Sequence, residues 1–214
     1  MPEQPLSQDC SLKAQLRERF RQRRAGLERT QRRAMAAELN RHLLADNGIT
    51  GVALVGAFLA FDGEPDVRFT LTQLARRGVG VALPVLPDDS KQPLCWRRWT
   101  PATPLSANRY GISEPLGTAE VHARDINALL MPLVAWDRQG TRLGMGGGWY
   151  DRSLADPELR ARRIGVAWTL QEAEAPLPRD PWDAPLDAVV TESGWFTCPP
   201  RDATMATAGD DLAR

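Results

Sequence analysis

The sequence predicts a single α/β domain whose centre is a mostly parallel sheet, preceded by a helical segment. Apolar runs of strand length at 52–60, 79–83 and 126–136 show no helical period, which is typical of strands buried on both faces. Between the first two runs lies a helix-like pattern with Leu71 and Leu74 on one face. This strand, helix, strand order is characteristic of a doubly wound sheet, where ligands bind beyond the carboxyl ends of the strands.

Two helices are predicted before the first strand, after a polar, proline-bearing tail at 1–10. Ser11 is a candidate N-cap for the first helix, and Gly26 marks its end. The second helix covers 27–45 and stops at Asn47-Gly48, which we expect to act as its C-cap. The apolar stripe expected on the first helix consists of Leu12, Leu16 and Phe20.

Basic residues are concentrated in these two helices and face few acids. A solvated helical face is one interpretation, and an RNA-binding patch is the other. Lys13 and Arg17 are a separate case, because residues four apart lie on the same face of a helix. The basic residues are Lys13, Arg17, Arg19, Arg21, Arg23, Arg24, Arg29, Arg32 and Arg33.

Three further strands are predicted along the rest of the chain. The segment 94–100 alternates, but nearby prolines confine it to a short or edge position. The runs 163–168 and 186–191 complete the set. We therefore expect one domain over 11–198 and a flexible tail over 199–214.

Composition excludes several classes of function. The chain of 214 residues carries 27 Lys and Arg against 27 Asp and Glu, so no global charge attracts nucleic acid or an anionic membrane. The beginning of the chain lacks the hydrophobic region of a signal peptide, and no apolar run reaches the roughly 18 residues that span a bilayer, so we expect a cytoplasmic protein. Cys10, Cys95 and Cys198 have no metal-site spacing. With only His42 and His122, histidine acid–base catalysis is not favoured.

A glycine-rich loop follows the apolar run 126–136. Arg142 is followed by Gly144 and by Gly146 to Gly148, and a helix-compatible segment begins at Trp149. Glycines let backbone N–H groups close around an anion, and a guanidinium is a forked, permanently charged donor. The loop matches neither the P-loop nor the GxGxxG pattern. Glycine content alone leaves phosphate binding and a tight structural turn equally open.

The extended pattern resembles the signature of the 5-formyltetrahydrofolate cyclo-ligase family, also called methenyltetrahydrofolate synthetases. That signature usually reads FD…G.RLG.G.GYYD, so Trp136 replaces a phenylalanine and Trp149 a tyrosine. The segment 108–115 resembles the family's YGIPEP with Ser113 for proline, and 182–192 its HDxxLDxVVTE with Trp182 for histidine. The resemblance covers about Lys13 to Glu192. The matching residues of the central pattern are Pro132, Ala135, Asp137, Gly140, Arg142, Leu143, Gly144, Gly146, Gly147, Gly148, Trp149, Tyr150, Asp151, Arg152 and Leu154.

The resemblance implies a single-domain, mostly parallel, Rossmann-like three-layer α/β fold of the NagB/RpiA/CoA-transferase-like class. It also implies a set of site residues. ATP would be bound by Lys13, Arg17, Arg142, Leu143, Gly144, Met145, Gly146, Gly147, Gly148, Trp149 and Tyr150, with Arg142 and Tyr150 as catalytic residues. The folate substrate would contact Leu59, Glu64, Arg109 and Tyr110, and Asp151 and Asp183 would hold Mg²⁺.

Several of these residues have an ordinary structural interpretation as well. Glu64 could be a loop carboxylate in water, and Tyr110 could fill core instead of stacking on a flat ring. Asp151 could cap a helix, and Asp183 could be a surface acid. Only the resemblance favours the functional interpretation of the two aspartates.

The implied reaction converts 5-formyltetrahydrofolate and ATP to 5,10-methenyltetrahydrofolate, ADP and phosphate. A formamide is a poor electrophile, so its oxygen must become a phosphate before the neighbouring arylamine can close the ring. Catalysis then rests on positioning and charge, without a dedicated general base. We expect a monomer that binds these small molecules and no nucleic acid or membrane. A non-catalytic nucleotide- or folate-binding relative and an RNA-binding module are the alternatives.

Overall fold

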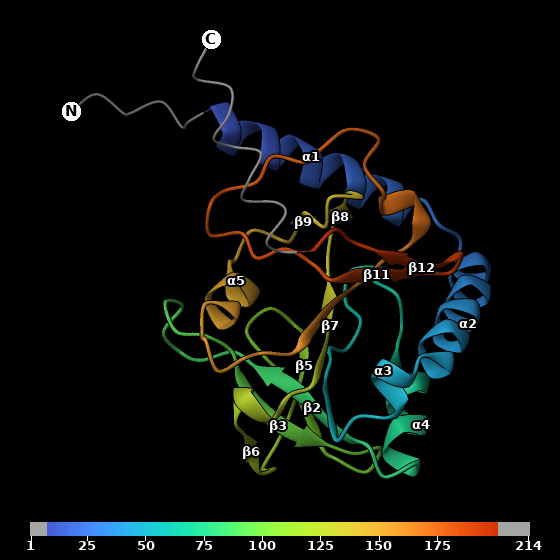
Figure 1. The fold of residues 1–214 in the computed structure, drawn as a ribbon, viewed down its shortest axis with the longest axis vertical. Coiled ribbons are helices and arrows are strands. Elements are labelled where there is room, and N and C mark those ends of the chain that lie inside the picture. The colour runs from blue at the N-terminus through green and yellow to red at the C-terminus, as the bar shows by residue number, and fades with distance from the viewer. Residues whose placement is uncertain (1–7, 201–214) are drawn as a thin grey trace.

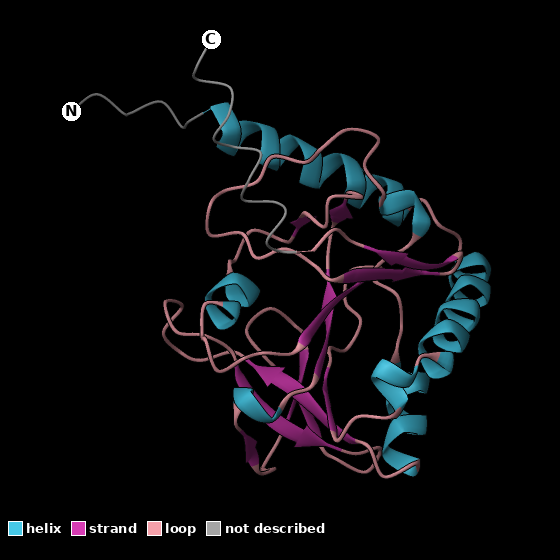
Figure 2. Ribbon diagram, in the orientation of Figure 1, coloured by secondary structure: helices cyan, strands magenta, loops and turns pink. Residues whose placement is uncertain are grey.

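Within residues 8–200, which the structure describes, the chain forms helices around one large sheet and two small ones (Figures 1 and 2). The structure is a computed structural model; residues 1–7 and 201–214, which belong to the predicted tails, lie outside the described residues. The helices are α1 (Gln8–Ala25), α2 (Arg29–Ala45), α3 (Asn47–Thr50), α4 (Arg68–Arg76) and α5 (Trp149–Leu154), with 3₁₀ turns η1 (Ala123–Asp125) and η2 (Thr169–Gln171). The large sheet contains β1 (Leu54–Gly56), β2 (Gly80–Val85), β3 (Cys95–Trp99), β6 (Glu120–Val121), β7 (Ala128–Pro132), β10 (Arg162–Val166), β11 (Ala188–Thr191) and β12 (Gly194–Thr197). The small sheets pair β4 (Leu105–Ala107) with β5 (Ser113–Pro115), and β8 (Ala135–Trp136) with β9 (Arg142–Leu143).

The large sheet is mostly parallel, as the sequence predicts. Its strand order is β12-β11-β10-β7-β1-β2-β3-β6. Parallel pairing runs from β11 through β10, β7 and β1 to β2, whereas β12 and β3 pair antiparallel with β11 and β2. Because the central strands are covered on both faces, their continuous apolar sequences follow from burial. The predicted α/β class is confirmed.

Helices cover both faces of this sheet. Figure 1 shows α2, α3 and α4 along one side and α5 on the other. The α2 and α4 residues Leu39, Leu43 and Leu71 pack in a core with β1 and β7, while Leu154 of α5 belongs to the core on the opposite face. A third cluster joins Phe20 of α1 to the β8–β9 pair. The result is the three-layer arrangement expected for this class, with α1 placed across one end. No helix in the described part of the chain is long and apolar enough to cross a membrane.

The amino-terminal helices differ from the prediction at their ends. Helix α1 already includes Gln8, so Ser11 lies inside it and is not its N-cap. Leu12 is 44% exposed and is not part of a buried stripe, because the inward face of α1 carries Lys13, Phe20 and Arg24. The break at Gly26 is confirmed, since α1 ends at Ala25.

The end of the second helix also differs. Asp46 is the C-cap of α2, and Asn47-Gly48 instead begin the short helix α3. The carboxylate of Asp46 is also held by Arg162, 3.0 Å away at the start of β10. A tertiary ion pair therefore fixes a boundary that the local Asn-Gly signal does not.

The apolar run 126–136 is not one strand. Strand β7 ends at Pro132, and the chain resumes as β8, which pairs antiparallel with β9 in a separate sheet. At the break, the side-chain amide of Gln171 donates to the carbonyls of Leu133 and Val134, at 2.8 and 3.0 Å. The buried carbonyls are thus satisfied where sheet pairing is lost.

The order of the strands locates the site. Strand β1 has β2 on one side and β7 on the other, so the chain changes direction across the sheet between β1 and β7. In open α/β sheets, ligands bind at such a switch point, beyond the carboxyl ends of the strands. The segments that leave these ends are 57–66 and 133–148. They carry Glu64 and the glycine-rich loop.

Candidate active site

The glycine loop, residues 144–148, joins β9 to α5. Gly146 and Gly148 have φ of 101° and 65°, which favour glycine, and a Cβ at Gly147 would lie 2.8 Å from the Trp149 ring. Among residues 8–200, no group accepts a hydrogen bond from the backbone N–H groups of residues 145–148. The loop thus presents unpaired backbone donors, and glycine is required where φ is positive, at Gly146 and Gly148, and where Trp149 is close, at Gly147. Helix α5 begins at Trp149, as the sequence predicts.

Arg142 is the buried cation beneath this loop. Its guanidinium donates to the carbonyl of Ala184 and to the carboxylate of Asp151. The turn before it is built on Asp137, whose buried carboxylate accepts from the N–H groups of Gln139 and Thr141, at 3.0 and 2.9 Å. Arg142 is therefore held rigidly. Asp151 pairs with it and does not cap α5, whose N-cap is Gly148.

Helix α1 brings two further cations to the same place. The Nζ of Lys13 lies 2.6 Å from Asp180 and 2.7 Å from Asp183. Arg17 Nε donates to the carbonyl of Gly144 at 2.9 Å, and its guanidinium lies beside Gly146. Burial alone would lower the pKa of Lys13, but hydrogen bonds and charge from the two aspartates outweigh it and raise the pKa. Lys13 therefore stays charged.

Asp151 and Asp183 approach each other through Ala184. The Oδ1 of Asp151 accepts from the N–H of Ala184 at 3.4 Å, and Asp183 precedes that residue in the chain. Both carboxylates face cations, so Asp183 is not an isolated surface acid. In the described residues, each has hydrogen bonds to only one of its two oxygens.

These free oxygens fit the needs of Mg²⁺. The ion accepts one or two protein carboxylates and completes its shell with water and phosphate oxygens. Within residues 8–200, no group of three or more His, Cys, Asp or Glu side chains could hold a metal ion by itself. A metal at Asp151 and Asp183 would thus depend on a bound phosphate for further ligands.

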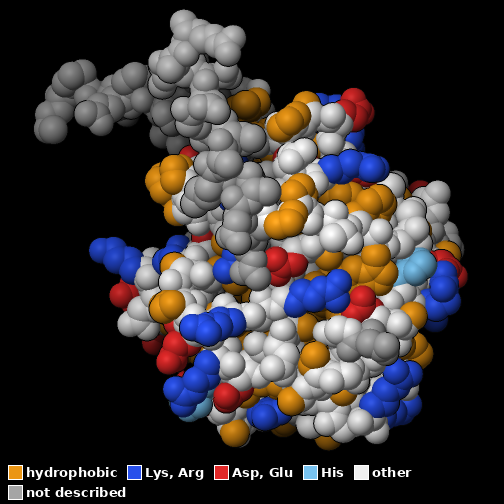
Figure 3. Space-filling model, in the orientation of Figure 1, with side chains coloured by type: hydrophobic (Ala, Val, Ile, Leu, Met, Phe, Trp, Pro, Cys, Tyr) orange, Lys and Arg blue, Asp and Glu red, His pale blue; other side chains and the backbone are white. Residues whose placement is uncertain are grey.

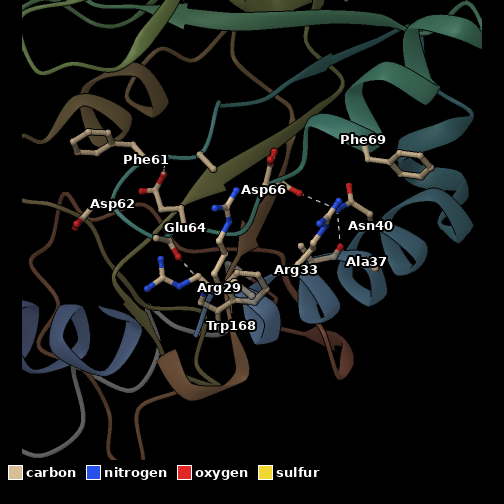
Figure 4. Close-up of a pocket in the computed structure, with 14 residues that line it drawn as sticks. Arg29, Arg33, Ala37, Asn40, Phe61, Asp62, Glu64, Asp66, Phe69 and Trp168 are labelled. Carbon is tan, nitrogen blue, oxygen red and sulfur yellow. Dashed lines mark hydrogen bonds between the residues drawn. The ribbon is translucent and has the colours of Figure 1, made fainter. Parts of the chain in front are cut away.

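Glu64 lines a pocket of about 790 Å³ between α2 and the segment that follows β1 (Figure 4). Its side chain is half-buried, and its Oε2 accepts from the N–H of Phe61 at 3.0 Å. Burial raises the pKa of Glu64 to about 7, although this hydrogen bond and Arg24 act in the opposite direction. Glu64 is therefore not an ordinary surface carboxylate in water.

Tyr150 lies in the first turn of α5, directly after the glycine loop. Burial raises the pKa of its phenol, the negative charge of Glu64 raises it further, and Arg142 lowers it, with a net increase. Tyr150 thus lies within electrostatic reach of Glu64 on one side and of Arg142 on the other. Its phenol stays neutral at physiological pH.

Arg109 and Tyr110 lie beside Trp149. The guanidinium carbon of Arg109 is 5.3 Å from the centre of the Tyr110 ring and 5.8 Å from that of Trp149. Tyr110 is 53% exposed, so it does not fill the core. Leu59, in contrast, belongs to the hydrophobic core and does not line the Glu64 pocket. Of the expected substrate contacts, the structure therefore places Glu64 in the pocket and the Arg109–Tyr110 pair beside the glycine loop.

Several residues that shape the site have no predicted role in the sequence. Arg24 is 1% exposed and binds the carboxylate of Asp62 at 2.8 Å, and Trp168 Nε1 donates to the carbonyl of Gly63 at 2.9 Å. These contacts fix the segment that carries Glu64. Spacing could have found Arg24, because Lys13, Arg17, Arg21 and Arg24 follow one another at four- and three-residue intervals on one helical face. Asp180 has no comparable signal.

Comparisons with known proteins agree with this geometry. Residues 9–192 match the family described as the 5-formyltetrahydrofolate cyclo-ligase family. The 5-formyltetrahydrofolate cyclo-ligase of Escherichia coli (strain K12) is 38% identical over 181 residues, which cover 81% of this chain and 97% of that relative. The Haemophilus influenzae protein of the same name is 34% identical over 178 residues, or 80% of this chain and 93% of that relative.

Solved structures share the fold. The 5,10-methenyltetrahydrofolate synthetase of Aquifex aeolicus superposes with a TM-score of 0.77 at 29% identity, over 88% of this chain and 94% of that one. The synthetase of Mycoplasma pneumoniae has a TM-score of 0.69 at 21% identity, over 84% of this chain and 98% of that one, and this likeness concerns the fold alone. Because the match extends over nearly all of the described residues and includes the glycine loop, the chain belongs to the 5-formyltetrahydrofolate cyclo-ligase family.

Proposed function

We propose that the protein catalyses the ATP-dependent cyclisation of 5-formyltetrahydrofolate to 5,10-methenyltetrahydrofolate, with release of ADP and phosphate. One observation carries this proposal beyond family membership. A loop of unpaired backbone donors is bordered by Lys13, Arg17 and Arg142, and Glu64 follows β1, the strand next to β7, at the same carboxyl edge of the sheet. A triphosphate and a reduced pterin can therefore be bound side by side.

The ATP phosphates would lie on the glycine loop. Its N–H groups donate to no acceptor among the described residues, and Arg17 and Lys13 border it from α1. Arg142 would face the transferred phosphoryl group, whose charge grows in the transition state. Leu143, at the start of the loop, is buried and anchors it, whereas Met145 is exposed at its tip.

Asp151 and Asp183 would hold Mg²⁺ through the oxygens that their cationic partners leave free. When bound, the metal would neutralise phosphate charge and align the terminal phosphate. Lys13 and Arg142 keep these carboxylates in place before nucleotide arrives. The two aspartates thus have the same proposed role as in the sequence analysis, supported by their shared contact with the Ala184 segment.

The pterin would be held by Glu64. An ionised carboxylate accepts two N–H bonds from an aminopyrimidine edge, which is a strong, bidentate arrangement. Tyr150 would cover the formyl group between the pterin and the phosphates. Arg109 and Tyr110 flank the glycine loop and would contact bound ligand there, and Leu59 would act through the core behind the pocket.

The chemical step needs positioning more than proton transfer. The formyl oxygen attacks the terminal phosphorus of ATP, its bond to phosphorus forms, and ADP leaves. The neighbouring arylamine then attacks the activated carbon and loses its proton, the carbon–oxygen bond breaks, and phosphate departs with its bonding electrons and can take up that proton, which gives the methenyl product. The protein has to hold the oxygen in line with the phosphate and stabilise the charge, which its cations and loop amides are suited to do.

The direct test mixes the protein with magnesium-ATP and 5-formyltetrahydrofolate and follows methenyl absorbance. Arg142→Ala should abolish the signal, whereas Arg138→Ala, which removes an exposed arginine four residues away, should leave it intact. Two controls test for misfolding: the conservative variant Arg142→Lys, and a thermal melt of each variant. ATP hydrolysis that does not depend on folate, or binding of both ligands without product, would contradict the proposal.

The comparisons give no support to the alternatives. Of the basic residues considered for RNA binding, Lys13, Arg17, Arg21 and Arg24 of α1 have partners within the protein, so these four are not free to bind phosphates of RNA. On the face shown in Figure 3, Lys and Arg side chains are dispersed among acidic and neutral ones and form no single patch. The monomeric state, the cytoplasmic location and the lack of nucleic-acid partners stay predictions.

A further inference from the structure

The pocket that contains Glu64 has a second polar wall that the proposed mechanism does not use. This wall is formed by one face of α2, where Arg29, Arg33 and Asn40 line the pocket opposite Glu64 and Trp168. Figure 4 shows the arginines projecting from α2 into the space in front of the segment that carries Glu64. Residues 29 and 33 are one helical turn apart, so their side chains can act on one ligand.

These two arginines are unpaired. Neither has an ion pair or a hydrogen bond with any residue from 8 to 200, and both are exposed. Asn40, in contrast, is occupied by the carbonyls of Ala36 and Asp66, at 2.6 and 2.8 Å. Arg32, the third α2 arginine at this pocket, donates to the carbonyls of Arg24 and Ala25, at 3.4 and 3.0 Å. Arg29 and Arg33 therefore supply the two guanidinium groups of this wall that have no partner among residues 8–200.

The two aspartates of the pocket, Asp62 and Asp66, do not pair with these arginines. The Oδ2 of Asp62 is bound by Arg21 and Arg24 of α1, and the Oδ1 of Asp66 accepts from the N–H of Arg68. Guanidinium groups bind carboxylates in a forked, two-bond geometry. The free pair on α2 thus selects for an anionic group on the α2 side of the pocket.

We propose that Arg29 and Arg33 form a subsite for the glutamyl carboxylates of the folate substrate, while Glu64 holds the pterin. The inference rests on the proposed function and adds the recognition of the other end of that substrate. A folate has hydrogen-bond donors on its aminopyrimidine edge and carboxylates on its glutamyl tail. The pocket has the complementary groups, an acceptor on one wall and cations on the other, in a volume typical of small-molecule sites.

The test compares two substrates: 5-formyltetrahydrofolate and 5-formyltetrahydropteroate, which lacks the glutamyl group. In the double variant R29A/R33A, KM for the glutamylated substrate should rise about tenfold with kcat unchanged, as expected when charge-assisted hydrogen bonds are lost equally from ground and transition states. KM for the truncated substrate and for ATP should not change. Arg41→Ala, an exposed α2 arginine outside the pocket, is the matched control.

Binding without ATP separates this inference from the proposed function. Trp168 lines the pocket, so its fluorescence can report folate binding when no turnover is possible. Suppose that the wild-type protein forms no methenyl product, but R29A/R33A binds the glutamylated substrate more weakly than the wild type does and binds the truncated one equally well. This result would support the subsite and overturn the proposed function. Normal turnover with equal KM changes for both substrates, or a rise in KM for ATP instead, would overturn the subsite alone.

Discussion

Helices α1 and α2 are both rich in basic residues, yet they use them in opposite ways. On α1, Lys13 contacts Asp180 and Asp183, and Arg24 is buried against Asp62. On α2, Arg29 and Arg33 have no partner among the described residues and face a pocket. The sequences of the two helices do not show this difference. It arises because α1 lies across loops that carry aspartates, whereas α2 borders an open space.

The comparison shows how a cation that holds a site together is distinguished from one that binds a ligand. A paired and buried cation should matter for stability or for the geometry of the site, and its loss should affect every substrate. An unpaired cation at a pocket wall should matter for one ligand and not for folding. Four measurements can break or sharpen this distinction.

Lys13→Ala should have the largest effect. The substitution leaves Asp180 and Asp183 without their shared cation and removes a charge beside the glycine loop. We expect kcat/KM for ATP to fall about 100-fold, because loss of a preorganised charged donor commonly has an effect of this size. Steady-state assays at varied ATP measure this. Arg33→Ala, the matched α2 change, should leave the ATP dependence untouched; equal effects on ATP would remove the distinction between the helices.

Arg24→Met should destabilise the fold. The substitution keeps the volume of the side-chain stem but breaks two hydrogen bonds of a 1% exposed guanidinium, to Asp62 and Leu133, at a cost of about 2–3 kcal/mol. Urea unfolding measures the change. Arg33→Met serves as the control and should stay close to wild type. If Arg24→Met left the free energy of unfolding unchanged, the buried contacts of Arg24 would not stabilise the fold.

The pH dependence of folate binding should follow Glu64. Because burial raises its folded pKa to about 7, above the usual value of 4.5, the folded protein holds more protons than the unfolded chain between these values. The contribution of this group to stability is therefore full below pH 4.5 and declines as pH rises to about 7. Binding to the ionised carboxylate should strengthen over the upper part of the same range.

Glu64→Gln is the control for this titration. The amide cannot ionise, so both the decline in stability and the gain in folate affinity with rising pH should disappear. Thermal melts and tryptophan fluorescence titrations between pH 5 and pH 8 (about the range where Glu64 titrates) report the two effects. If the wild type and Glu64→Gln share one pH profile, another group controls binding.

Arg21→Gln should have the smallest effect. Arg21 pairs with Asp62 at 3.0 Å, but its side chain is 44% exposed, so solvent screens the pair and we expect less than about 1 kcal/mol. Urea unfolding of Arg21→Gln and of Arg24→Met gives the loss in free energy of unfolding for each of the two arginines that pair with Asp62. A larger loss at Arg21 than at Arg24 would show that pairing, and not burial, decides the contribution.

Much of the fold was predictable because its signals are local. The apolar runs that became β1, β2, β7, β10 and β11 are buried on both faces, and such burial requires continuous apolar sequence wherever the strand lies in the sheet. The start of α5 after the glycine loop was equally predictable, since positive φ at Gly146 and Gly148 is a property of those residues. The break inside 126–136 was not, because it depends on Gln171, a distant residue that takes over the carbonyls.

What the sequence by itself determined was the class of the sheet, the glycine loop and the identity of the charged residues around it. Only the tertiary structure decided which charges meet. Lys13 and Asp183 are 170 positions apart, the free arginines of α2 face Glu64 across a pocket, and Leu59 lies in the core. Backbone preferences and burial patterns are set by neighbouring residues, whereas a contact between distant side chains exists only once the path of the whole chain is fixed.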